Sequence, residues 1–151
     1  MKSVISKTIV GAVVCATLLS FSPAPGGEGF EIYLGNKLLT QQFGSKINEV
    51  KSLQIDQAAY NEQLIVKYYH CGRIGKHRVI TIKDEQDKVL KEFRFADWPA
   101  PVNEMSCKVK DIISLKKGSS TILKLYYSSS ELPNGRLLAS IVSGNALAVR
   151  H

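Results

Sequence analysis

The feature that most constrains this chain is a series of short segments in which apolar and polar residues alternate. The clearest is the run 30–34, FEIYL, which places Phe, Ile and Leu at every second position. Because successive side chains of a β-strand point to opposite faces, this period of two predicts a strand with one buried side. Gly35 and Asn36 follow and accept a positive φ at low cost, so we expect a two-residue hairpin turn and a second strand over 37–43.

Further short segments with strand character, separated by turn-forming residues such as those at 132–135, cover 50–55, 64–69, 78–83, 89–95, 121–127 and 136–142. The segment 107–115 fits a strand or one short helical turn equally well. No segment of ten or more residues carries apolar positions at helical spacing. About eight or nine short strands without a long helix predict an all-β protein, a single antiparallel β-sandwich, with a small β-barrel as the alternative.

Residues 1–24 have the three regions of a removable secretion signal. Lys2 and Lys7 provide a basic start, an apolar run without charge covers 9–21, and small residues with a proline lead to Ala24. We expect cleavage after about Ala24. The apolar run is shorter than the roughly 20 residues that span a bilayer, so the processed chain is not expected to be transmembrane.

We therefore expect an exported protein, in the periplasm, on the outer surface or in the medium. A lipid anchor at Cys15 is the alternative, but two valines precede this cysteine where small residues are preferred, and apolar residues continue after it. Within the processed chain we expect a flexible Pro/Gly-rich lead over 25–29, the sandwich domain over 30–143, and a tail over 144–151 with no clear role.

The chain is basic, with 20 Lys and Arg against 13 Asp and Glu and a formal net charge of +7. Loss of the leader removes two lysines and leaves about +5. The excess is dispersed, and its densest part is the group Arg73, Lys76, His77 and Arg78. Nucleic-acid binding requires a basic stripe, so we expect no such partner and only a weak attraction to anionic polymers.

Two cysteines remain after processing, Cys71 and Cys107. In an oxidising compartment an even count predicts a disulfide, here closing a loop of about 37 residues, with two separate buried thiols as the alternative. Together with His70, His77 and Met105 they are potential ligands of soft metals. Adjacent strand residues point to opposite faces and no zinc spacing is present, so we expect neither a metal nor another cofactor.

Two surfaces are candidates for binding, and the first is the loop that carries Trp98 between Asp97 and Pro99. Exposed loops on a rigid sandwich commonly carry function, and a flat indole supplies stacking area at low entropy cost. The alternative is that Trp98 folds back and caps the end of the core.

The second surface combines Lys67 and Tyr69 on one predicted strand with Lys124 and Tyr126 on another. If these strands are neighbours, the four side chains form a basic aromatic face that suits an anionic glycan. The alternative is a solvated face on which lysine stems cover apolar surface.

Three stretches, EIYLGNKLL over 31–39, YHCGR over 69–73 and LYYSS over 125–129, resemble segments of small exported proteins of Bacteroidota with no assigned function. The resemblance covers most of the processed chain and includes no catalytic signature. It implies an envelope or secreted β protein and carries over no functional residues.

The sequence favours binding over catalysis, because it has no Gly-x-Ser-x-Gly elbow and no spacing that selects a pair of carboxylates. We expect a non-catalytic binding module whose site is the Trp98 loop with neighbouring tyrosines, and whose ligand is a glycan or another envelope protein. A structural or assembly component that pairs through an exposed edge strand is the runner-up. An enzyme of unknown class comes third.

Overall fold

The computed structural model describes residues 27–100 and 103–144, and the predicted leader and all but the first residue of the predicted tail lie outside these ranges. The elements, in chain order, are β1 (Glu28–Leu34), β2 (Lys37–Phe43), a 3-10 turn η1 (Gly44–Lys46), β3 (Lys51–Gln54), a second 3-10 turn η2 (Gln57–Ala59), β4 (Gln63–His70), β5 (Val79–Lys83), β6 (Val89–Arg94), β7 (Met105–Lys108), α1 (Val109–Ile113), β8 (Leu123–Ser129) and β9 (Leu132–Val142).

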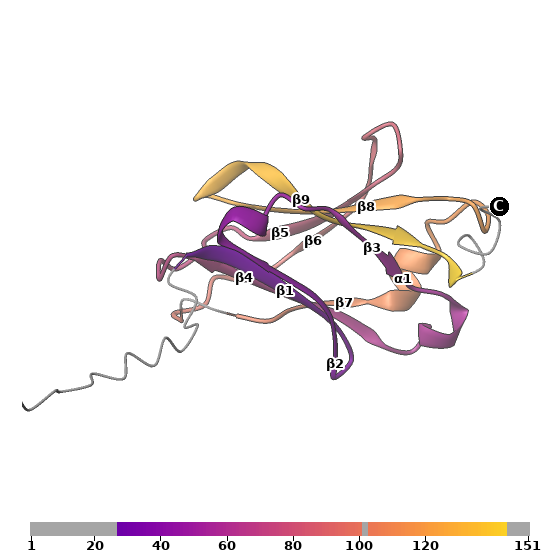
Figure 1. Ribbon diagram of the computed structural model, residues 1–151, viewed down its shortest axis with the longest axis horizontal. Coiled ribbons are helices and arrows are strands. Elements are labelled where there is room, and N and C mark those ends of the chain that lie inside the picture. The colour runs from indigo at the N-terminus through magenta and orange to yellow at the C-terminus, as the bar shows by residue number, and fades with distance from the viewer. Residues whose placement is uncertain (1–26, 101–102, 145–151) are drawn as a thin grey trace, which may run out of the picture.

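The strands form two sheets that pack against each other as two layers, as Figure 1 shows. One sheet has four strands in the order β2-β1-β4-β7, and the other has five in the order β3-β9-β8-β5-β6. The expected all-β sandwich is confirmed. The expectation of a fully antiparallel fold is wrong at one edge, because the short strand β3 pairs in parallel with β9.

The core follows from the alternation of apolar residues along the central strands. In β4 every second residue is buried, namely Leu64, Val66, Tyr68 and His70, and β8 has the same pattern. These inner faces meet between the two sheets and are joined by apolar residues of β1, β5 and β9. Complete burial of one large aliphatic side chain contributes about 1.5–3 kcal/mol, so the inner faces hold the layers together.

The segment 107–115 combines both structures that its sequence allowed. β7 ends at Lys108 and α1 begins at the next residue, with Val109 and Ile112 buried against the core. The short helix lies at the end of the sandwich where β9 finishes (Figure 1). The hairpin turn at Gly35 and Asn36 is also confirmed, with Gly35 at φ +55°.

The opposite end of the sandwich is built from three connections, which we call the loop end. They are the β4–β5 loop (71–78), the described part of the β6–β7 connection (95–100 and 103–104) and the β8–β9 turn at Ser130 and Glu131. The last of these differs from our expectation. The Leu-Pro-Asn-Gly sequence at 132–135 does not form the turn but lies inside β9, where the register shift between Tyr127 and Ser129 of β8 accommodates it.

The sandwich begins two residues earlier than we expected, because Glu28 and Gly29 already belong to β1 and pair with His70 and Tyr69. The predicted flexible lead is therefore shorter than 25–29. Among the described residues, no helix is long and apolar enough to cross a membrane.

Candidate ligand-binding surfaces

The predicted disulfide between Cys71 and Cys107 is absent, and the topology explains why. Cys107 pairs with Leu64 in β4, whereas Cys71 follows the far end of the same strand. Seven residues of extended chain separate these positions by roughly 20 Å, whereas a disulfide needs Cα atoms within about 7 Å. Cys71 is an exposed thiol at the loop end, and Cys107 is a buried thiol in the core.

The Trp98 loop is the part of the loop end that offers the most aromatic surface. Trp98 is 54% exposed, the largest value among the large hydrophobic side chains that the structure describes as exposed. Of the two alternatives that the sequence left open, this exposure favours a projecting side chain over a cap on the core. An exposed indole in this position presents a flat face to a ligand.

Hydrogen bonds from the β4–β5 loop hold this loop in place. The carboxylate of Asp97 accepts a bond from the backbone N–H of His77 at 2.8 Å, and Arg78 donates from Nη2 to the Ala96 carbonyl at 3.1 Å. Phe95 donates its N–H to the Arg78 carbonyl at 3.0 Å. Trp98 thus follows a segment that is tethered at three successive residues.

The β4–β5 loop itself is backbone-strained and tied to the β8–β9 turn. Cys71 and His77 adopt φ values of 54° and 51°, a region that residues with a Cβ rarely occupy. His77 Nδ1 lies 2.8 Å from Ser130 Oγ, and Glu131 accepts a bond from the Lys76 N–H at 3.0 Å. Strain of this kind persists only where surrounding contacts over-determine it, and it concentrates at ligand-binding sites.

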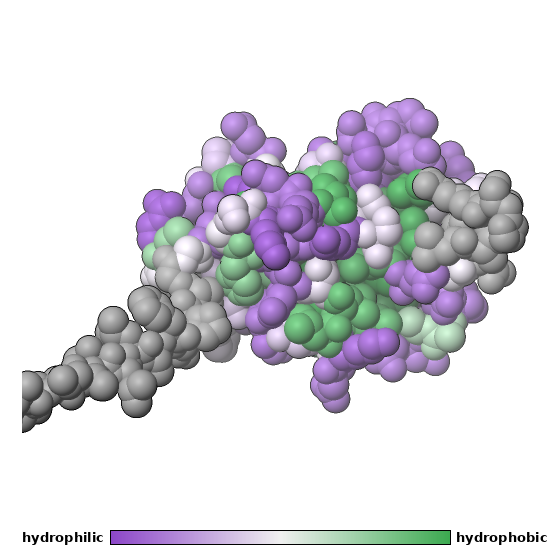
Figure 2. Space-filling model, in the orientation of Figure 1, coloured by the Kyte–Doolittle hydropathy of each residue, from purple (hydrophilic) through white to green (hydrophobic). Residues whose placement is uncertain are grey.

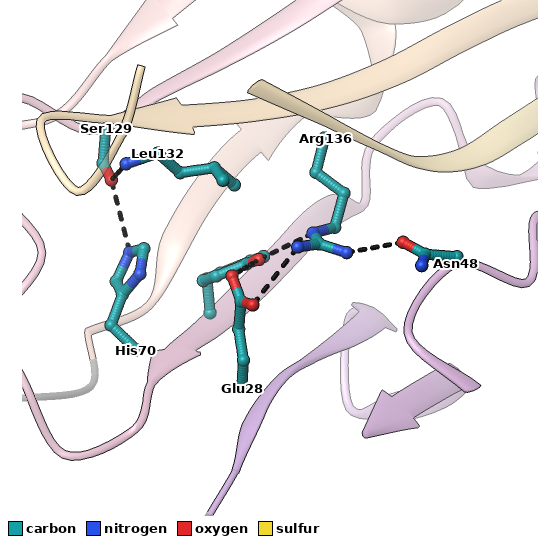
Figure 3. Close-up of polar contacts among 7 residues, drawn as sticks. Glu28, Asn48, His70, Ser129, Leu132 and Arg136 are labelled. Carbon is teal, nitrogen blue, oxygen red and sulfur yellow. Dashed lines mark hydrogen bonds and ion pairs between the residues drawn. The ribbon is translucent and has the colours of Figure 1, made fainter. Parts of the chain in front are cut away.

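A buried histidine lies directly beneath these loops, as Figure 3 shows. His70 Nε2 is 2.8 Å from the hydroxyl of Tyr127 and 3.3 Å from Ser129 Oγ, and Ser129 also accepts the N–H of Leu132. Burial lowers the pKa of His70 and raises the pKa of Tyr127 to about 12. Both groups are therefore neutral near pH 7 and serve as packing partners between the sheets.

A second polar cluster connects the first residue of β1 to the last strand (Figure 3). Arg136 donates to Glu28, to the hydroxyl of Tyr68 and to the side-chain oxygen of Asn48, at 3.2, 2.9 and 2.6 Å. Tyr68 in turn donates to Glu28. Each charged atom of this cluster has a partner, so it fixes the start of β1 without leaving an uncompensated charge.

Arg78 is the exception to this pattern of satisfied polar groups. The residue is only 5% exposed, and its Nε has no hydrogen-bond partner among the described residues. The loop above it approaches closely, because a Cβ added to Gly75 would lie 3.0 Å from His70 Cδ2 and 3.1 Å from Arg78 Cδ. Glycine at this position is what allows the loop to cover both side chains.

The proposed joint face of lysines and tyrosines does not exist. Lys67 and Tyr69 belong to β4 in the four-stranded sheet, whereas Lys124 and Tyr126 belong to β8 in the five-stranded sheet. Both pairs alternate with core residues of their strands, so they lie on opposite outer faces of the sandwich. The local pattern does not predict which strands are neighbours, because apolar and polar residues alternate in the same way in both sheets.

On the outer face of the four-stranded sheet, Glu31 accepts hydrogen bonds from two tyrosine side chains. Tyr33 and Tyr69 both donate to Glu31 Oε2, at 3.1 and 3.0 Å. Phe43 packs against Tyr69 with 5.4 Å between ring centroids, and Lys67 lies 5.0 Å from the centre of the Tyr33 ring. We call these five residues the tyrosine face. Burial and Glu31 together raise the pKa of Tyr69 to about 12, so its phenol stays protonated.

A hollow of about 180 Å³ lies beside the tyrosine face. Besides Tyr33 and Lys67, it is lined by the hairpin turn Gly35-Asn36, by Ile65 and by Glu104. Lys67 forms an ion pair with Glu104 at 3.2 Å, and this bond raises the pKa of the lysine. The hollow thus offers an aromatic side, an aliphatic side and several hydrogen-bonding groups, the mixture that small-molecule sites use.

On the outer face of the five-stranded sheet, Tyr126 has different neighbours. Lys124 forms an ion pair with Asp87 at 2.8 Å, and Tyr126 donates to the same carboxylate at 3.3 Å. Lys83 lies 4.1 Å from the centre of the Tyr126 ring and covers it. This face therefore carries one tyrosine and an excess of positive charge.

Two contacts between a serine hydroxyl and a basic side chain were not predicted from the sequence. One joins Ser130 to His77, as described above, and the other places Lys116 Nζ 3.0 Å from Ser143 Oγ and 2.9 Å from the Ile55 carbonyl. Burial lowers the pKa of Lys116. Each contact joins two separate segments of the chain, and we interpret both as ties between segments.

The other predicted groups are dispersed. Met105 and Cys107 are fully buried in the core, away from the exposed Cys71. Across residues 27–100 and 103–144, no three His, Cys, Asp or Glu side chains come together as a metal ion would require. Figure 2 shows hydrophobic side chains gathered in the middle and lower middle of the view, with hydrophilic side chains around them.

No protein-family model matches this chain, and no curated protein is similar enough to count as a relative.

Proposed function

We propose that this chain is an exported binding module that recognises a glycan through the loop end, with Trp98 as the central contact. The observation that carries the proposal is an exposed indole on a tethered loop. A ligand loses less free energy when the group that it contacts is already held in place. Trp98 directly follows the tethered residues and adds a flat apolar surface that a sugar ring can cover.

The surroundings of the loop add hydrogen-bonding groups. Lys76, His77 and Ser130 are exposed at the loop end, and the half-buried Glu131 lies beside them. A glycan presents hydroxyl groups around an apolar ring face and requires both kinds of contact. Export is supported by the composition of residues 1–24, which has the order of regions typical of a secretion signal.

The direct test uses the fluorescence of Trp98, which is the chain's single tryptophan. We expect that a panel of polysaccharides contains at least one that shifts the emission of the processed protein to shorter wavelength, because the ligand removes water from the indole. Trp98→Ala should abolish retention on that polysaccharide in an affinity gel while the far-UV circular dichroism stays unchanged.

The matched control is Tyr60→Ala, which removes another exposed aromatic side chain. Tyr60 lies just before β4, whereas the β4–β5 loop of the loop end lies just after this strand. The control residue is therefore at the opposite end of β4 from the proposed site. Retention that survives Trp98→Ala would reject Trp98 as the contact. Retention on no glycan, together with Trp98-dependent capture of an envelope protein, would reject the ligand class.

Assembly through an edge strand has one observation in its favour. Among the four edge strands, β2 is seven residues long and Lys37 is its only charged residue, so it lacks the charges that usually protect an edge. The register shift beside Leu38 and Thr40 interrupts this edge, which makes pairing less favourable. If β2 mediates self-association, Gln41→Lys should convert the assembly to monomer in size-exclusion chromatography, and an unchanged elution volume would exclude this strand.

A further inference from the structure

We propose that the tyrosine face is a second ligand site, separate from the Trp98 loop, and that it binds a neutral glycan. The site consists of Glu31, Tyr33, Phe43, Lys67 and Tyr69 on the outer face of the four-stranded sheet, with the adjoining hollow. It does not depend on the proposed role of Trp98, because Trp98 is not part of it, and Glu104 in the lining of the hollow is the one residue that it shares with the loop end.

The two tyrosine rings are fixed before any ligand arrives. Glu31 lies between them and accepts a hydrogen bond from each phenol, at 3.1 Å from Tyr33 and 3.0 Å from Tyr69. Aromatic side chains that are already ordered give up little conformational entropy on binding. A carboxylate accepts more than two hydrogen bonds, so Glu31 retains the capacity to accept another from a ligand hydroxyl.

The aromatic surface extends to the edge of the sheet because Gly29 separates Phe43 from Tyr69. All three residues are opposite one another in the pairing of β2, β1 and β4. A Cβ at position 29 would lie 1.9 Å from Phe43 Cδ1, so only glycine leaves the space that the Phe43 ring occupies. The result is a continuous apolar strip across three strands, which suits an extended chain of sugar rings more than a compact ligand.

The charges of the site exclude an anionic ligand, contrary to the expectation from the sequence. Lys67 is neutralised by Glu104 at 3.2 Å. Glu31 then leaves the site with one excess negative charge, although the whole chain is basic. A carboxylated or sulfated polymer would meet this carboxylate, and like charges at close range are destabilising. Neutral hydroxyl groups can donate to Glu31 and Glu104 without this penalty.

The hollow beside Tyr33 supplies a place for a ring or a side branch. Ile65 and Tyr33 provide apolar contact, and Asn36, Lys67 and Glu104 provide donors and acceptors. A few polar groups around apolar walls orient a ligand and give specificity. The strip of aromatic rings and this hollow therefore form one surface for a neutral polymer.

The outer face of the other sheet provides the matched control. Tyr126 also has a lysine over its ring and a carboxylate on its hydroxyl, but it has no second tyrosine there, and Lys83 and Lys124 outweigh Asp87. If the neutral-glycan site depends on the arrangement and charge described here, loss of Tyr126 should have no effect on it.

The test compares four proteins in affinity gels that contain neutral polysaccharides (cellulose derivatives, xylan, mannan, laminarin and starch) or anionic ones (alginate and heparin). They are the processed wild type, the double variant Tyr33→Ala/Tyr69→Ala, Tyr126→Ala and Trp98→Ala. We expect retention by at least one neutral polysaccharide. Loss of the two aromatic contacts should weaken it about fivefold or more, and Tyr126→Ala should leave it unchanged.

The outcomes separate the two sites. Weaker retention in both Trp98→Ala and the double variant supports two contacts on one polymer, and loss in the double variant alone supports the tyrosine face while rejecting Trp98. Loss in Trp98→Ala alone leaves the loop end as the site and overturns the tyrosine face. Retention only by alginate or heparin, or by no neutral polysaccharide, also overturns it. A fifth protein, Tyr33→Phe/Tyr69→Phe, keeps the rings but loses their hydrogen bonds to Glu31; it guards against misfolding and should bind between the wild type and the double alanine variant.

Discussion

Cys107 is buried in the core, whereas Cys71 is exposed at the loop end. An even number of cysteines in an exported chain predicts a disulfide, but the rule contains no information on distance. The pairing of β7 with the first half of β4 places Cys107 far from Cys71. Prediction from single residues fails for the same reason at Tyr69 and Tyr126. Whether these two tyrosines share one face depends on which strands are neighbours, and the sequence around each residue does not contain this information.

The two thiols should differ strongly in reactivity. Burial raises the pKa of Cys107 to about 12, so the thiolate that reacts with alkylating reagents is almost absent at pH 8. We predict that iodoacetamide modifies Cys71 in the native protein and modifies Cys107 only after unfolding, as read by peptide mass spectrometry. Modification of both at equal rates in the native state would contradict this burial.

His70 should make stability depend on pH. Burial holds its pKa in the folded state below the ordinary value near 6.5, so the unfolded chain binds a proton more readily. The free energy of unfolding should therefore fall as the pH drops below about 6.5. Urea midpoints at pH 8 and pH 5 measure this difference, which we expect to shrink in His70→Gln and to persist in the exposed control His77→Gln. An equal difference in both variants would reject His70 as the source.

At the level of elements, most of the fold was predictable from the sequence. The hairpin signal at Gly35 and Asn36 predicted β2 with its observed bounds, and alternation predicted β4 to within one residue at each end and β8 two residues too early. Alternation did not predict which residues of β6 face the core. The pairing of β5 with β6 shifts register between Ile82 and Lys83 of β5, so that Leu90 packs on the core and Val89 is exposed. A bulge changes which residues face inward, and the local sequence pattern does not predict its position.

The tyrosine face was only half predictable for a related reason. Lys67 and Tyr69 could be recognised because they share one side of a strong strand. Glu31 and Tyr33 join them only through the pairing of β1 with β4, which is a long-range property of the sheet. The predicted strand at residues 30–34 did place Glu31 and Tyr33 on its polar side, and that was the only available signal.

The cluster around Arg136 should stabilise the packing of β1 against β9. The side chains of Arg136 and Glu28 are 18% and 33% exposed, so solvent screens their attraction only in part. We predict that Arg136→Met costs about 1–2 kcal/mol in urea unfolding, and that the double variant with Glu28→Gln costs less than the sum of the single changes. The exposed pair Lys51–Glu49 is the control, and Lys51→Met should cost less than about 0.5 kcal/mol.

For the whole molecule, stability should come from the two-sheet core without a covalent link. The loop end and the tyrosine face are then two surfaces on one rigid scaffold. We predict that a reducing agent leaves the thermal midpoint of the processed protein unchanged, because it has no disulfide to break. A midpoint that falls on addition of dithiothreitol, in a scan followed by circular dichroism, would show that Cys71 and Cys107 are joined after all.

Both proposed sites predict where a ligand contacts the sandwich. The most direct measurement is a titration of the ¹⁵N-labelled processed protein with a retained neutral polysaccharide, followed by amide and indole chemical shifts. We predict that the shifts concentrate at the Trp98 indole and at the amides of Glu31, Tyr33 and Tyr69, with Tyr126 unaffected. Shifts centred on Tyr126 and its neighbours would contradict both proposed sites. So would a titration in which neither the Trp98 indole nor the tyrosine face shifts.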